Sequence, residues 1–204
     1  PFTALPGVVT AATDLAFLLA AAIAVAFPVV RVRQYNNMIF APMLLGLWLA
    51  NLLMHLQLLG ISAHTAVIGE RMGIALIVLL MVVMGSRVLP FFIEMGTAQR
   101  HATRKYPRVE IAGNIVTTAW ALYYTLMGND LAAGLLALIA AILLGIRAAG
   151  WHLRALWGVP LLWILYVGFL WVPLGLLLLW FSALGWTAGS YAIHALTVGA
   201  MGIM

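Results

Sequence analysis

Seven long apolar runs, separated by short polar segments, make up nearly the whole chain. The runs cover residues 8–30, 37–60, 69–93, 109–128, 130–147, 159–183 and 189–204. Backbone polar groups find no water inside a bilayer, so a segment that crosses it must be a helix or a strand of a closed barrel. These runs are too long for barrel strands and lack their alternation of polar and apolar residues. The pattern predicts an all-α fold, a polytopic transmembrane helix bundle of about seven spans that forms a single transmembrane domain over residues 1–204.

The composition indicates that the apolar runs have a lipid bilayer as their main partner. Hydrophobic residues make up 66% of the 204 residues and charged residues 7%, whereas soluble domains carry about a quarter charged residues. The absence of cysteine excludes disulfides, thiolate metal sites and cysteine nucleophiles. Phosphate-binding glycine loops, H-E-x-x-H zinc motifs and nucleophile elbows are also missing from the sequence. Any chemistry is therefore expected inside the membrane.

The two ends of the sequence lead us to expect a longer protein. The first residue is Pro1, and no basic segment with a cleavage site precedes the first run. A helix from Ser190 to Met204 would be about 22 Å long, short of a hydrocarbon core of about 30 Å. We therefore expect the remainder of the same chain to be a partner of these runs.

Most basic residues lie in alternate connections between the runs. Eight of the ten belong to this set: Arg31, Arg33, Arg100, Arg104, Lys105, Arg108, Arg147 and Arg154. Under the positive-inside rule these connections face the cytoplasm, and the residues before the first run are extracytoplasmic. This topology explains the net charge of +5, and no nucleic-acid partner is predicted.

Two histidines inside the apolar runs are the first candidates for chemistry. His55 shares one helical stripe with Trp48 and Asn51 on the second run, and His194 lies on the last run, which crosses in the opposite direction. Both are expected about 5 to 10 Å below the outer surface. Each is an interhelical hydrogen-bonding or snorkelling residue, a haem or copper ligand, or part of a proton relay. As ligands, their second ring nitrogens would need acceptors, for which Asn51 and Thr197 are the first candidates.

Two charged residues inside the runs are further candidates. Asp14 precedes a long apolar stretch in the first run, where it is either a carboxylate at the interface or a group acting near the histidines. Arg87 lies near the inner end of the third run, and Pro90 is expected to bend that helix between Arg87 and Glu94. Arg87 either snorkels to the interface or binds an anion: a haem propionate, a substrate, or the carboxylate of Glu94.

Five segments together carry a resemblance to a known family. They are NLLMHL at 51–56, GSRVLPFF at 85–92, PLLWIL at 160–165, PLGL at 173–176 and HALTVGAMG at 194–202. In this order and spacing the chain resembles the NnrS family of bacterial inner-membrane proteins, which contain haem and copper and are associated with nitric oxide, nitrosative stress and denitrification. The family is about twice as long as this chain. Two positions depart from its pattern: Ser86 stands where a glycine is expected, and Tyr166 where a histidine is expected.

The resemblance implies a haem- and copper-associated protein of the bacterial inner membrane that acts in the nitric oxide response. We expect His55, His194, Asn51 and Arg87 at the cofactor site, with the two histidines as metal ligands from different helices. The resemblance does not settle which histidines bind haem and which bind copper. Nitric oxide or a related small molecule is the expected partner, and the residues do not choose between binding it and passing electrons. The alternatives are a transporter that uses Asp14 and Arg87 as an ion path, and a structural subunit of a respiratory complex.

Overall fold

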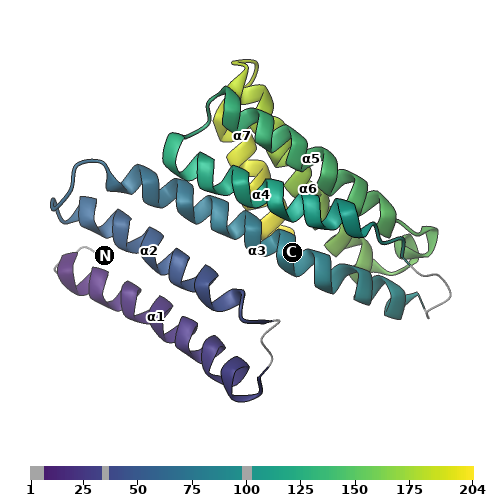
Figure 1. Cartoon of the computed structure of the whole chain (residues 1–204), viewed down its shortest axis with the longest axis horizontal. Coiled ribbons are helices and arrows are strands. Elements are labelled where there is room, and N and C mark those ends of the chain that lie inside the picture. The colour runs from purple at the N-terminus through teal and green to yellow at the C-terminus, as the bar shows by residue number, and fades with distance from the viewer. Residues whose placement is uncertain (1–6, 34–36, 98–102) are drawn as a thin grey trace. The chain divides into compact units, whose positions relative to one another are not determined.

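The computed structural model describes residues 7–33, 37–97 and 103–204, and these residues form helices joined by short connections (Figure 1). The predicted all-α class is therefore confirmed. The elements in chain order are α1 (Gly7–Arg31), α2 (Phe40–Leu58), α3 (Thr65–Gly96), α4 (Pro107–Met127), α5 (Leu131–Trp151), the 3-10 helix η3 (Arg154–Gly158), α6 (Pro160–Ala183), α7 (Gly189–His194) and the π-helix η4 (Ala195–Met201).

Five of these helices, α1, α2, α3, α5 and α6, are long and apolar enough to cross a membrane. Helix α4 has 21 residues but includes polar residues such as Asn114 and Thr118, which lower its hydropathy. The last predicted run forms the six-residue α7 followed by the seven-residue η4. The prediction of about seven spans thus corresponds to seven α-helices within the described ranges. The chain is a multi-pass membrane protein.

The chain divides into two compact units, residues 1–76 and 77–204, and the division falls inside α3. In the N-terminal unit, α1 and α2 lie side by side (Figure 1). The start of α3 approaches α2 closely, because a Cβ atom on Gly69 would lie 2.5 Å from the carbonyl oxygen of Ala50. Glycine at this position therefore permits backbone contact between the two helices.

In the C-terminal unit, α6 packs against α5, α7 and η4 (Figure 1). Phe169 and Val172 on α6 are fully buried. A Cβ atom on Gly175 would lie 2.6 Å from Leu196, and one on Gly199 would lie 2.6 Å from the ring of Trp171. Small residues on both helices therefore let α6 and η4 approach closely, which is how helices associate in membranes.

The connection between α4 and α5 is a tight turn capped by an aspartate. Gly128 has a φ of 89°, a left-handed conformation that glycine adopts easily. Asp130 is the N-cap of α5, and its Oδ1 accepts a hydrogen bond of 2.8 Å from the backbone N–H of Ala133. Its Oδ2 accepts one of 2.9 Å from the hydroxyl of Tyr123. These donors, Ala133 first, hold the pKa of Asp130 below its ordinary value.

Candidate functional site

His55 on α2 is paired with Asp14 on α1. Its Nε2 lies 3.3 Å from Oδ2 of Asp14, and the side chains are 11% and 57% exposed respectively. When the carboxylate accepts this hydrogen bond, Nε2 carries the hydrogen and Nδ1 remains for another partner. Of the two roles predicted for Asp14, this geometry favours the one near a histidine.

Asn51 does not take the predicted place beside His55. It is half-buried one turn earlier on α2, and among the described residues no hydrogen bond joins the two side chains. The acceptor beside the His55 ring is Asp14 instead. A second polar group on the same helical stripe, the indole N–H of Trp48, is buried and has no partner in the described part of the chain. Asn51 as a cofactor-binding residue stays a prediction.

His194 is the last residue of α7, and its ring is oriented by its own helix. Its Nδ1 lies 2.7 Å from the backbone carbonyl oxygen of Ser190. A carbonyl oxygen can only accept, so Nδ1 donates, and in the neutral ring the lone pair of Nε2 is left for a ligand. His194 is exposed. The hydroxyl of Thr197, predicted as its partner, donates instead to the carbonyl of Ile193 at 2.7 Å.

The π-helix η4 begins at Ala195, directly after His194. Such segments are rare and often occur at functional sites, because they rotate the residues that follow onto a different face. Here the residues after His194 pack on α6 through Leu196 and Gly199, while the histidine ring itself stays accessible. His55 belongs to the N-terminal unit and His194 to the C-terminal unit, so their predicted common depth stays a prediction.

Arg87 is exposed on α3, and its role at a cofactor site stays a prediction. Glu94, proposed above as one possible partner of Arg87, accepts a hydrogen bond of 3.1 Å from the backbone N–H of Thr103 and a second from its hydroxyl. It also lies 3.9 Å from the ammonium group of Lys105. The Glu94 carboxylate thus connects the end of α3 to the segment that leads into α4.

The placement of Arg147 in a connection between helices was wrong. Helix α5 continues to Trp151, so Arg147 lies one turn inside it and is only 1% exposed. Its guanidinium donates hydrogen bonds to the hydroxyl of Ser86 at 2.5 Å, the carbonyl oxygen of Glu110 at 2.6 Å and Oδ1 of Asn114 at 3.0 Å. These acceptors on α3 and α4 replace water, which is why a charged residue can occur here.

Arg147 is a buried cation that the hydropathy pattern did not identify. Its Nε is buried and has no partner in the part of the chain that the structure describes. A signal was present in the sequence, because the segment LLGIRAAGW at 143–151 surrounds the arginine with apolar and small residues on both sides. Such surroundings are unusual for a residue in a polar connection and typical of one inside a helix.

The two departures from the family pattern both have local structural roles. Ser86 accepts the hydrogen bond from Arg147 and donates to the carbonyl of Val82. Its neighbour Gly85 cannot change in the same way, because a Cβ atom there would lie 2.6 Å from the ring of Phe169. The serine therefore stands at the position of the pair where a side chain fits.

Tyr166 is buried on α6, and its hydroxyl donates to the carbonyl of Ala148 at 3.1 Å. Its ring centroid lies 6.1 Å from that of His152, which follows α5. A histidine therefore lies near Tyr166 after all, although it comes from a different helix end. The Nε2 of His152 accepts a hydrogen bond of 3.1 Å from the indole N–H of Trp157, so this nitrogen is already engaged.

Within residues 7–33, 37–97 and 103–204, no group of three or more His, Cys, Asp or Glu side chains is placed to hold a metal ion. Haem iron needs only one protein side chain at each axial position. The Nε2 of His194 and the Nδ1 of His55 both fit that requirement.

Comparison with known proteins gives one informative result. Neither a curated protein nor a solved structure matches the chain. The family model described as NnrS protein matches residues 2–204. Because the match covers nearly the whole sequence, the resemblance carried by the five segments is confirmed and the chain belongs to the NnrS family.

Proposed function

We propose that this chain is a haem-binding membrane protein in which His194 and His55 each serve as a ligand of haem iron. Membership of the NnrS family associates it in general with the response to nitric oxide. The observation that carries the cofactor proposal is the hydrogen bond of 2.7 Å from Nδ1 of His194 to the carbonyl of Ser190. Metal-ligating histidines almost always donate their second ring N–H to such an acceptor, which fixes the tautomer and the ring orientation.

The pair of His55 and Asp14 supports a second ligand of the same kind. With Nε2 directed at the carboxylate of Asp14 at 3.3 Å, the ring is held in one orientation and Nδ1 is available. A carboxylate beside the second ring nitrogen is a common partner of a metal-ligating histidine. Haem iron, when bound, would supply a one-electron redox couple and, where a single histidine ligates it, a coordination position for a diatomic molecule such as nitric oxide. No described residue is assigned to copper.

The visible spectrum of the complete purified protein tests the proposal. We expect a Soret band in the wild type and a clear loss of haem per protein in His194→Ala. The matched control is His64→Ala. His64 is exposed in the connection between α2 and α3, so this variant removes one imidazole outside the proposed site. Full haem content in His194→Ala, or an equal loss in the control, would refute the assignment.

One observation favours a second candidate function, proton transfer through a transporter. Asp14 is 57% exposed while its partner His55 is 11% exposed, so the pair links the protein surface to a buried imidazole. Arg87, the other residue of the transporter hypothesis, belongs to the C-terminal unit and stays a prediction. Colourless wild-type protein whose proton flux in liposomes is lost in Asp14→Asn would support this function over the first.

A further inference from the structure

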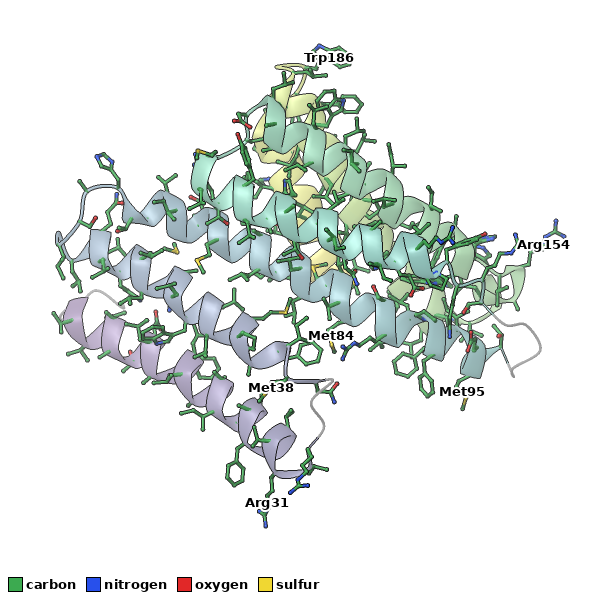
Figure 2. All side chains as sticks on the ribbon, in the orientation of Figure 1. Arg31, Met38, Met84, Met95, Arg154 and Trp186 are labelled. Carbon is green, nitrogen blue, oxygen red and sulfur yellow. The ribbon has the colours of Figure 1, made fainter. Side chains whose placement is uncertain are left out.

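Three exposed arginines occur at one end of the C-terminal unit. Arg104 precedes α4, Arg108 lies in its first turn, and Arg154 begins η3. Figure 2 shows Arg154 projecting beyond the ends of the helices. From the sequence alone, these residues indicate only the topology. Their arrangement in the fold suggests a more specific role.

The backbone brings the three arginines to the same helix end. The N–H of Arg104 donates a hydrogen bond of 2.8 Å to the carbonyl of Gly150, near the end of α5. A Cβ atom on Gly150 would lie 2.6 Å from the carbonyl oxygen of Arg104 and 3.1 Å from the ring of Tyr106. The segment from Arg104 to Tyr106 therefore lies directly on α5. Arg108 follows this segment by two residues, and Arg154 follows Gly150 by four residues.

The positive charge of this end is not balanced by neighbouring carboxylates. Glu94 is already engaged by Thr103 and Lys105. Among the described residues, no carboxylate oxygen lies within 4.0 Å of Arg104, Arg108 or Arg154. Exposed guanidiniums in such a group attract anions and bind phosphate through two parallel hydrogen bonds.

Apolar surface lies directly along the helices that carry these charges. Ile111 and Ile115 on α4 are 61% and 63% exposed, and Ile142 and Ile146 on α5 are 54% and 44% exposed. The ring of Trp157, which is 50% exposed, lies at the charged end. Tryptophan at the end of an apolar helix surface marks the level of the lipid headgroups. A ligand that fits both parts has an anionic head and long apolar chains.

We propose that Arg104, Arg108 and Arg154 form a binding site for the headgroup of an anionic phospholipid. The phosphate contacts the guanidiniums, and the acyl chains lie along the isoleucines of α4 and α5. Basic residues at helix ends on the cytoplasmic side recognise anionic lipids in this way. The close contact at Gly150 holds the segment that carries Arg104 in place. The arginines are therefore arranged by the fold and do not act as independent charges.

Native mass spectrometry of the complete protein in detergent tests this site, with phosphatidylglycerol and phosphatidylcholine as probes. We expect the wild type to prefer phosphatidylglycerol and Arg108→Gln/Arg154→Gln to bind it about thirtyfold more weakly. The control is Arg31→Gln/Arg33→Gln, which removes the same charge from the end of α1. An equal loss in the control, or no loss in Arg108→Gln/Arg154→Gln, overturns the proposal.

Two variants that leave the charge unchanged distinguish a specific lipid site from nonspecific electrostatic attraction. Gly150→Ala displaces the segment of Arg104 and should weaken binding of phosphatidylglycerol. Gly145→Ala, on the same helix with nothing within 4 Å of its Cβ position, should not. Unchanged binding in a folded Gly150→Ala protein overturns the proposal; if that variant does not fold, the arginine variants decide. The proposal is also overturned if inorganic phosphate competes for the site as effectively as phosphatidylglycerol does, or if an acidic protein binds there and phosphatidylglycerol does not.

Discussion

The side chain of Arg147 on α5 donates a hydrogen bond to the hydroxyl of Ser86 on α3. The guanidinium is 1% exposed, so it depends on protein acceptors in place of water. We expect Ser86→Ala to destabilise the protein by about 1–3 kcal/mol, because it leaves a buried charged donor without its acceptor. Thermal unfolding in detergent measures the change.

The same relationship predicts strong coupling between the two residues. Arg147→Met removes the charge together with its need for acceptors, so Ser86→Ala should cost less than about 0.5 kcal/mol in that background. Thr118→Ala removes an exposed hydroxyl from α4 and is the control for losing a hydroxyl elsewhere. Equal costs of Ser86→Ala in both backgrounds would show that the hydrogen bond contributes little.

The pair of Asp14 and His55 predicts the effect of Asp14 on haem binding. Asp14→Ala removes the acceptor that orients the ring, and losses of such partners lower metal affinity about tenfold or more. Haem titration of the apoprotein, followed at the Soret band, measures this affinity. Glu70→Gln removes an exposed carboxylate from α3 in the same unit and should leave it unchanged. If both variants bind haem like the wild type, Asp14 does not position His55 for ligation.

The sequence predicted the fold well because its main signal is local. Apolar runs bounded by polar residues determine where helices lie in a membrane protein. The same rule misplaced Arg147, since a hydropathy pattern ends a span at a charged residue. The acceptors that keep Arg147 inside α5 come from Ser86, Glu110 and Asn114 on other helices. Such contacts depend on packing, which the sequence pattern does not contain.

The candidate site shows the same division between local and distant contacts. Asp14 and His55 are 41 residues apart, so the periodicity of one helix cannot pair them. The acceptor of His194 was accessible to sequence reasoning, because the Ser190 carbonyl lies four residues earlier, one helical turn away. Thr197 was predicted instead because only side chains were considered as acceptors for the second ring nitrogen of His194, and backbone carbonyls were not.

Asp130 predicts a pH dependence of stability at the start of α5. The N–H of Ala133 and the hydroxyl of Tyr123 hold its pKa below the ordinary value of 3.8. The folded state therefore favours the carboxylate, and the stabilisation is fully present above the unfolded pKa and lost as the pH falls through the lower folded pKa. The melting temperature of the wild type should fall with acid in this range more steeply than that of Asp130→Asn. Tyr123→Phe, which removes one of the two donors, should give an intermediate slope, and parallel slopes in all three proteins would contradict this origin.

The topology prediction can be tested at the two ends of α6, because the chain contains no cysteine. Thr103 is a poor labelling position, since it is 7% exposed and its hydroxyl is bonded to Glu94. Gly158 precedes α6 and has open space around its Cβ position, and Trp186 follows α6 and is 72% exposed. A membrane-impermeant thiol reagent applied to intact cells should label Trp186→Cys and leave Gly158→Cys unlabelled. Permeabilised cells are the control, in which both variants should react.

The burial of Arg147 removes one of the eight charges behind the topology prediction, but Arg154 remains at the same end. If Gly158→Cys is labelled in intact cells and Trp186→Cys is protected, the orientation of the chain is the reverse of the predicted one.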